Sequence, residues 1–200
     1  MRRASILLFG FLAGCTSVSS NYTGDITRTE TTRLYVCHGY NCNYKTRLDI
    51  NQQDADQFAE IFAYAPTSPE EERKAVSVAV QYFERRSEQV IGITDQPKST
   101  LAGTRERGQM DCIDESTNTR SLLLYLEKRG LLTHHNVQAN VSRGFFLDGR
   151  YPHSTAVLRE RGGEKWAVDS WYAPMGGAPD ILPLREWLPR GFLSAGDLPV

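Results

Sequence analysis

The stretch from 108 to 130, GQMDCIDESTNTRSLLLYLEKRG, constrains the fold more than any other part of the chain. Apolar residues recur in it at helical spacing and a glycine closes it, which predicts an amphipathic helix with Cys112 in its first turn. The unpaired N–H groups and partial positive charge of a helix N-terminus favour a thiolate over a thiol. Cys112 is therefore a candidate nucleophile, although many free cysteines are simply small buried hydrophobes. The expected apolar stripe is Ile113, Leu122, Leu123 and Leu126, and the expected stop is Gly130.

The N-terminus has the pattern of an export signal. Two arginines precede an apolar run over residues 6–12, which is too short to span a bilayer. The run ends in LAGC, whose cysteine is Cys15, and this resembles the lipobox of bacterial lipoproteins. The resemblance implies that residues 1–14 are a signal peptide and that Cys15 carries a lipid anchor. Since Thr16 and not aspartate follows, it also implies an outer-membrane location facing the periplasm. The alternative is an ordinary signal peptide in which Cys15 is incidental.

The length and the charge of the chain limit its domain organisation and its partners. Residues 15–30 are polar and lack periodicity, which predicts a flexible tether, and residues 31–200 suffice for one domain. The chain has 23 Lys and Arg against 24 Asp and Glu, a net charge of −1. No bulk field favours nucleic acid, so we expect no nucleic-acid partner.

The cysteine count is informative in an oxidising compartment. With Cys15 lipidated, Cys37 and Cys42 are the natural disulfide pair, because only the turn-forming HGYN separates them. Their spacing with His38 does not match the usual zinc sites. Cys112 is then left over as a free thiol, unless it pairs with Cys37 or Cys42 instead.

Hydrophobic periodicity changes along the chain from helical to alternating. One helix is expected at 54–64. A second is expected to begin after Ser68, with Pro69 at its first position and Glu71 completing a capping box. A loop is expected over 92–107. The expected strands are 32–36, 137–141, 145–147, 153–160 and 165–171, and a last short helix is expected at 184–188. This organisation predicts an α+β fold with N-terminal helices packed on an antiparallel sheet.

His153 and Asp169 lie on the two strands of an expected hairpin. With its turn centred on Gly162 and Gly163, His153 falls opposite about residue 172, and a slip of one or two residues brings Asp169 closer. A cysteine nucleophile needs a base, and the base needs a partner that fixes its tautomer. We therefore expect a Cys112-His153-Asp169 set, although each residue taken singly has an ordinary structural interpretation.

The order cysteine, histidine, aspartate on helix, strand and neighbouring strand resembles the transglutaminase-like cysteine proteinase superfamily, a circularly permuted relative of papain. The resemblance covers about residues 105–190 and rests on GQMDCIDES, YPHSTAVL and KWAVDSWY. It implies a papain-like fold in which Cys112, His153 and Asp169 are catalytic. The chain departs from the family pattern after the histidine, where Ser154 and Thr155 replace alanine and an aromatic residue. It departs again after the aspartate, where Ser170 replaces proline.

The resemblance also implies roles for nearby residues. The Cys112 N–H and the Gln109 side chain are candidate oxyanion donors. In one peptidase branch acidic residues beside the cysteine bind calcium. Asp111 and Asp114 are weak candidates for that role, because hard cations want several oxygens. We otherwise expect no cofactor.

The expected function is that of a lipid-anchored thiol hydrolase or acyltransferase, most simply a cysteine peptidase or amidase acting on a protein or peptide substrate of the cell envelope. Two alternatives remain open. One is a non-catalytic binding or assembly lipoprotein, and the other is a structural lipoprotein in which Cys112 forms a disulfide.

Overall fold

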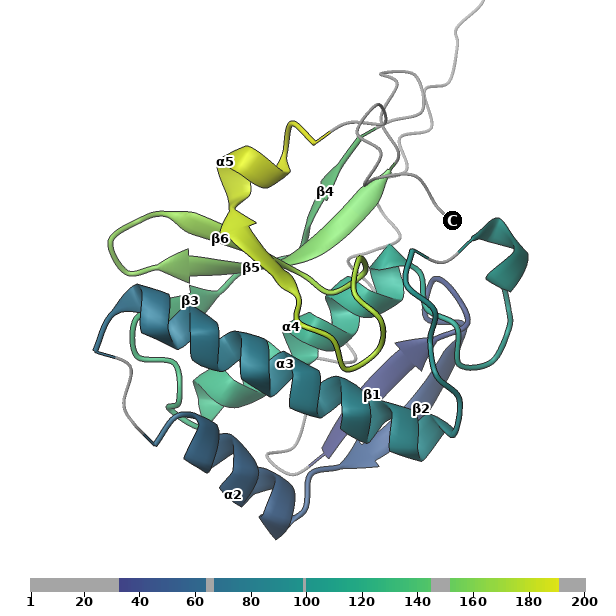
Figure 1. Ribbon diagram of the computed structural model, residues 1–200, viewed down its shortest axis with the longest axis horizontal. Coiled ribbons are helices and arrows are strands. Elements are labelled where there is room, and N and C mark those ends of the chain that lie inside the picture. The colour runs from purple at the N-terminus through teal and green to yellow at the C-terminus, as the bar shows by residue number, and fades with distance from the viewer. Residues whose placement is uncertain (1–32, 64–66, 99, 145–151, 191–200) are drawn as a thin grey trace, which may run out of the picture.

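The computed structural model describes residues 33–63, 67–98, 100–144 and 152–190 (Figure 1). The expected signal peptide at 1–14, Cys15, the tether at 15–30 and the strand at 145–147 lie outside these residues. Within the described ranges, no helix combines the length and the apolar character needed to cross a membrane.

The chain folds into helices and antiparallel sheets, which confirms the α+β class. The elements run in the order β1 (Arg33–His38), β2 (Tyr44–Asp49), α2 (Gln52–Ile61), α3 (Pro69–Ile91), the 3-10 turn η1 (Leu101–Gly103), α4 (Cys112–Lys128), β3 (His135–Val137), β4 (Val141–Arg143), β5 (His153–Glu160), β6 (Lys165–Asp169), β7 (Asp180–Pro183) and α5 (Leu184–Trp187).

Local signals explain where the two N-terminal helices begin. Ser68 caps α3 by accepting the N–H of Glu71, and Pro69 takes the first position, as predicted. The Glu71 carboxylate accepts mainly the N–H and hydroxyl of Thr67, both at 2.7 Å, while the Ser68 N–H adds a smaller effect that lowers the pKa of Glu71. A complete capping box joins Asn51 and Asp54 at α2, a helix that begins before the predicted residue 54.

Two sheets carry the rest of the chain. The hairpin β1–β2 stands alone, while the larger sheet has the order β3-β5-β6-β7, with β4 also paired to β5. The strand predicted at 137–141 is two strands, β3 and β4, which pair with opposite halves of β5. The β5–β6 hairpin pairs Arg159 with Lys165 and Ala156 with Val168, a register one residue away from the prediction.

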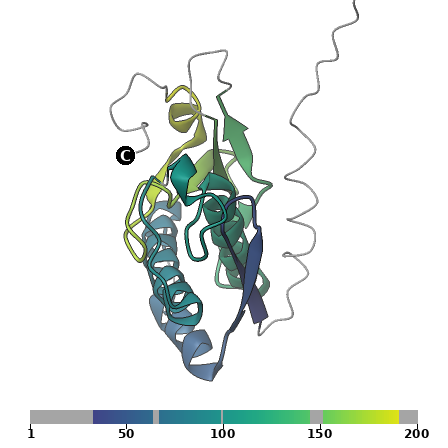
Figure 2. The same ribbon diagram turned by 90° about the vertical axis from the view of Figure 1, so that its right-hand side faces the viewer.

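Helix α4 is the central element. It contacts α3, the hairpin strand β1 and the sheet strand β5, so it lies between the N-terminal helix pair and the hairpin (Figures 1 and 2). The predicted apolar stripe holds only in its second half, where Leu122, Leu123 and Leu126 are fully buried. In its first half the buried residues are polar: Asp114, Glu115, Ser116, Thr117, Asn118 and Thr119. A helix buried with so many polar groups needs partners for them.

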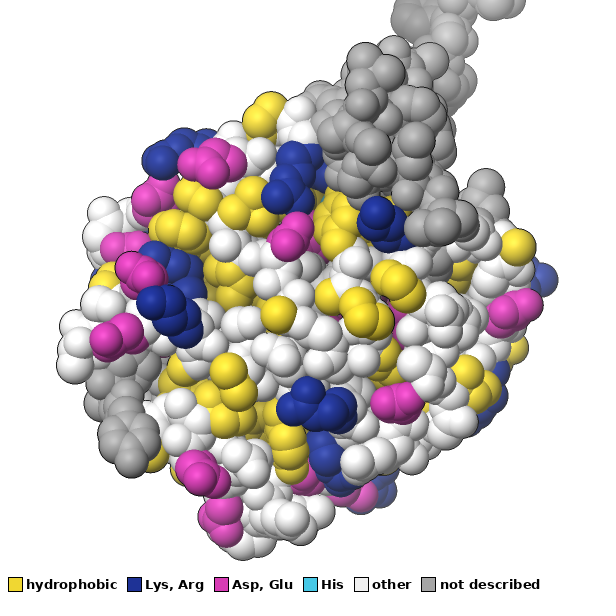
Figure 3. All heavy atoms as spheres, in the orientation of Figure 1, with side chains coloured by type: hydrophobic (Ala, Val, Ile, Leu, Met, Phe, Trp, Pro, Cys, Tyr) yellow, Lys and Arg dark blue, Asp and Glu magenta, His cyan; other side chains and the backbone are white. Residues whose placement is uncertain are grey.

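The molecular surface carries charges of both signs. On the face seen in Figure 3, Lys and Arg side chains are interspersed with Asp and Glu and with apolar side chains. That mixture agrees with the near-zero net charge of the sequence.

Candidate active site

Cys112 is the first residue of α4, as predicted. Asp111 caps the helix by accepting the N–H groups of Ile113 at 3.1 Å and Asp114 at 2.9 Å. The thiol is free and partly exposed. The alternative in which Cys112 joins Cys37 or Cys42 is therefore wrong, because those two residues are bonded to each other.

The sheet brings His153 and Asp169 together. Continuing the observed register past Ala156 and Val168 places Asp169 across from Thr155, so His153 is its diagonal neighbour on the same face. His153 Nε2 lies 2.7 Å from Asp169 Oδ2, with both side chains buried. Trp187 Nε1 donates to the same carboxylate oxygen at 2.7 Å, which fixes the carboxylate in turn.

Three aromatic rings hold the imidazole of His153. Ring centroids lie at 4.8 Å for Trp171, 5.3 Å for Tyr172 and 5.6 Å for Trp187. These rings restrict the orientation of the imidazole and exclude water from its Asp169 bond. A dry hydrogen bond to a carboxylate is stronger than the same bond in water.

The hydrogen bonds assign the tautomer of His153. Asp169 accepts, so Nε2 carries the hydrogen and Nδ1 is the basic nitrogen. Nδ1 is buried and has no hydrogen-bond partner among the described residues. An unpaired acceptor in a buried position costs free energy of folding. Its presence at Nδ1 therefore points to a role in accepting a proton or a hydrogen bond from another group.

The Cys112 sulfur contacts the two residues that flank His153. Sγ lies 4.0 Å from the carbonyl oxygen of Pro152, to which the thiol donates. Burial and the charge of Asp111 raise the pKa of the Cys112 thiol, while the N–H of Ser154 opposes the rise. This rise in pKa runs opposite to the expected effect of the helix N-terminus, because burial disfavours the thiolate.

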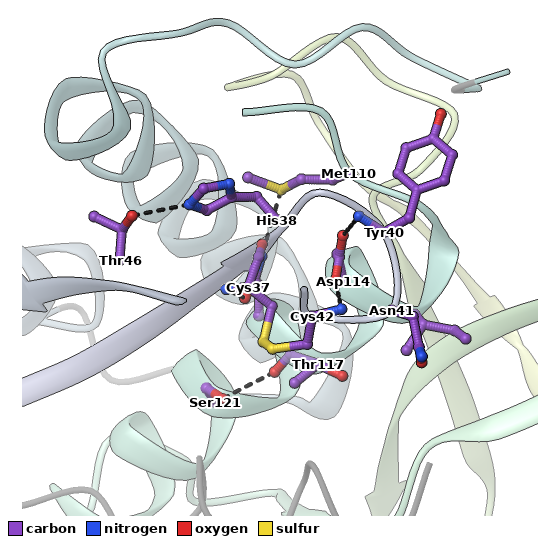
Figure 4. The surroundings of a disulfide bond; sticks show 12 residues. Cys37, His38, Tyr40, Asn41, Cys42, Thr46, Met110, Asp114, Thr117 and Ser121 are labelled. Carbon is purple, nitrogen blue, oxygen red and sulfur yellow. Dashed lines mark hydrogen bonds between the residues drawn. A yellow bond between two sulfur atoms is a disulfide. The ribbon is translucent and has the colours of Figure 1, made fainter. Parts of the chain in front are cut away.

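The disulfide loop lies against the start of α4. Cys37 and Cys42, predicted to pair, form a disulfide, and the backbone from Gly39 to Cys42 is left-handed at every residue, with φ between 52° and 82°. Successive left-handed residues point their N–H groups to one side, which makes an anion-binding concavity. Tyr40 and Cys42 donate to Asp114 at 2.8 and 2.5 Å, as Figure 4 shows.

The loop makes two further contacts with α4. The Asn41 N–H donates to Asp111 at 3.0 Å. The Asn118 side chain pairs with the backbone N–H and carbonyl of Cys37, at 2.7 and 2.8 Å. The residues Asp111, Asp114 and Asn118 thus bind one loop from one side of the helix.

The hydrogen bonds of Asp111 and Asp114 bear on the predicted calcium site. Both oxygens of Asp111 and both oxygens of Asp114 accept backbone N–H groups. Cys37 and Cys42 lie close to Asp114, but their sulfurs are bonded to each other and are not thiolate ligands. The candidate calcium site is therefore not supported, since its oxygens already have partners.

The Gln109 side chain, predicted as an oxyanion donor, is engaged elsewhere. Its Nε2 donates to the carbonyl of Thr94 at 3.2 Å, in an exposed position. The oxyanion candidate that remains is the N–H of Cys112, which has no intrahelical acceptor because it opens the helix.

Sequence reasoning missed residues that tie α4 to the site. Ser116 Oγ donates to Ser154 Oγ at 3.2 Å, and Ser170 Oγ donates to Glu115 at 3.0 Å. Asp95 accepts the N–H of Met110, just before Cys112, at 2.7 Å. One signal was available: Ser154 and Ser170 directly follow His153 and Asp169 in the sequence.

Comparisons with protein families, with curated proteins and with solved structures give no match to this chain.

Proposed function

We propose that the protein is a thiol hydrolase or acyltransferase of the transglutaminase-like, papain-like kind, with Cys112 as nucleophile, His153 as base and Asp169 as the orienting carboxylate. One observation carries the proposal. The buried His153 is oriented by Asp169 and keeps Nδ1 unpaired, on the segment whose neighbours, Pro152 and Ser154, contact the sulfur.

The proposed reaction begins with transfer of the Cys112 proton to His153 Nδ1. The thiolate attacks the carbonyl carbon of an amide or ester, and the resulting oxyanion accepts the N–H of Cys112. The imidazolium then protonates the leaving nitrogen or oxygen, which leaves a thioester on Cys112. Water or an amine, deprotonated by Nδ1, attacks the thioester, and the thiol is restored. Asp169 stabilises the imidazolium throughout.

The proposed setting follows from the N-terminal sequence. A lipid on Cys15 would hold the domain at the outer membrane facing the periplasm, with a protein or peptide of the cell envelope as substrate. The Cys37–Cys42 disulfide supports an oxidising compartment.

The kinetics of alkylation by iodoacetamide test the proposal. We expect Cys112 to be alkylated about 10²-fold more slowly in His153→Ala than in the wild type, because the substitution removes the base. His134→Ala is the matched control, because this partly exposed histidine lies beside β3 and away from Asp169. Equal rates in the wild type and His153→Ala would overturn the proposal.

A second candidate function is a binding or assembly module without turnover. The raised pKa of the Cys112 thiol favours it, as does the bond of this thiol to Pro152 rather than to the base. This candidate predicts a slow thiol whose alkylation is indifferent to His153, so the same experiment separates the two.

A further inference from the structure

We propose that Ser154 and Ser170 are positioning residues, which fix the distance between the sulfur on α4 and the imidazole on the sheet. The inference rests on the proposed function. Each serine directly follows one member of the pair, Ser154 after His153 and Ser170 after Asp169.

Ser154 lies against α4. Its hydroxyl accepts from Ser116 Oγ at 3.2 Å, and its backbone N–H acts to lower the pKa of the Cys112 thiol. Both serines of this contact are buried, so water does not compete for the bond. Because Ser116 lies one turn beyond Cys112, the contact fixes the position of the sulfur along the helix axis relative to β5, the strand that carries His153.

Ser170 binds the same helix at a second point. Its hydroxyl donates to Glu115 at 3.0 Å and accepts from Thr119 at 2.9 Å, so its hydrogen-bonding capacity is used on both sides. Glu115 and Thr119 are one turn apart on α4, and both are buried. This contact therefore fixes the end of β6, where Asp169 lies, along the helix axis.

The Ser154 contact holds α4 to the strand of the base, and the Ser170 contact separately holds it to the strand of the carboxylate. Catalysis by a cysteine and a histidine on different elements depends on their separation, and a misplacement of about 1 Å is enough to slow such a reaction strongly. A buried serine on α4 need not have this role. Ser121 is buried too, but its hydroxyl bonds to the Thr117 carbonyl within the helix, at 2.9 Å.

Ser121 therefore provides the matched control. We would measure Cys112 alkylation by iodoacetamide across pH, together with the melting temperature, for Ser154→Ala, Ser170→Ala and Ser121→Ala. The first two are expected to react about tenfold more slowly and with a shifted pH profile. Ser121→Ala is expected to lower the melting temperature alone, and Ser170→Thr, which keeps the hydroxyl, to restore the rate.

Two variants guard against misfolding. Ser116→Ala and Thr119→Val remove bonds to Ser154 and to Ser170 from the helix side, and they should slow alkylation as the strand variants do. If His153→Ala slows alkylation but the serine variants match Ser121→Ala in rate and pH profile, this inference alone is overturned. If His153→Ala leaves the rate unchanged, the proposed function is overturned and this inference with it.

Discussion

The described part of the chain holds two buried histidine–carboxylate pairs, and one of them has an unpaired ring nitrogen. His135 Nδ1 lies 2.8 Å from Glu72 Oε1, and His153 Nε2 lies 2.7 Å from Asp169 Oδ2. All four side chains are buried. By distance and burial alone the two pairs are alike.

Their remaining hydrogen bonds differ. His135 uses its second nitrogen on Arg73, at 3.2 Å. Glu72 accepts the backbone N–H groups of Thr133, His134 and His135, which join α3 to the turn before β3. Burial raises the pKa of Glu72, but these hydrogen bonds prevail and lower it to about 2. The Glu72 pair is thus a complete structural clamp, whereas the Asp169 pair keeps one basic nitrogen available. Both histidines have a short bond to a carboxylate, so this bond does not distinguish them. The unpaired Nδ1 of His153 does.

The largest expected effect is that of Asp169→Asn. The substitution keeps the shape but removes the charge that stabilises the imidazolium, so Cys112 alkylation should fall by as much as about 10²-fold, the effect expected of His153→Ala. The melting temperature should change little in comparison. A rate within a few-fold of the wild type would mean that Asp169 does not serve the base.

The matching substitution in the other pair, Glu72→Gln, should affect stability instead. It removes a buried charge that accepts several N–H groups, and we expect a loss of about 3 kcal/mol in the free energy of unfolding. Denaturant titration measures the loss. Alkylation of Cys112 in the folded variant should be unchanged, and a lower rate would show that the two pairs are not independent.

Trp187→Phe probes the Asp169 pair more gently. It retains an aromatic ring beside His153 but removes the N–H that donates to Asp169. One lost bond to a charged group costs about 1.5 kcal/mol, which is about tenfold in rate. Trp171→Phe is the comparison, because Trp171 also packs against His153, with ring centroids 4.8 Å apart, and this substitution also keeps an aromatic ring there.

The last expected effect concerns stability alone and comes from a change of pH near neutrality. Burial and the charge of Glu115 raise the pKa values of Glu84 and Asp95 to about 9, above those of the unfolded chain. The folded state then binds more protons than the unfolded state, so stability falls as pH rises toward 9. Glu72 acts in the opposite sense, because its lowered pKa gives stability that is lost as pH falls toward 2.

Thermal unfolding between about pH 6 and about pH 8 checks this slope, which should stay below about 1.4 kcal/mol per pH unit for each group. Asp95→Asn should flatten it and Glu72→Gln should leave it in place. Stability that rises with pH over this range would contradict the raised pKa values of Glu84 and Asp95.

Local signals were sufficient for several elements. The strand at His153–Glu160, the start of α3 after Ser68 and the start of α4 at Cys112 were all predicted correctly. Each has a strong local cause: an apolar run followed by a glycine turn, a capping serine with proline, or a capping aspartate.

Other elements depend on partners that are distant in the sequence. Strand β2, Tyr44–Asp49, buries only Leu48 and was not predicted, because its pairing with β1 and not its composition makes it a strand. The polar first half of α4 has the same explanation. Asp114 and Asn118 reach residues more than 70 positions away, so no window around Cys112 reveals them.

The sequence order of catalytic types indicated the candidate site, but not its protonation state. Burial of Cys112 beside Asp111 depends on the folded surroundings, and so does the choice of Pro152 as acceptor for the thiol. The aromatic enclosure of His153 joins Trp171 and Tyr172, which lie in KWAVDSWY, with the more distant Trp187.

The loop closed by Cys37 and Cys42 has a consequence for the candidate site. Its amides bind Asp111 and Asp114 at the start of α4. Reduction of the disulfide is therefore expected to loosen the contact between this loop and the residues around Cys112.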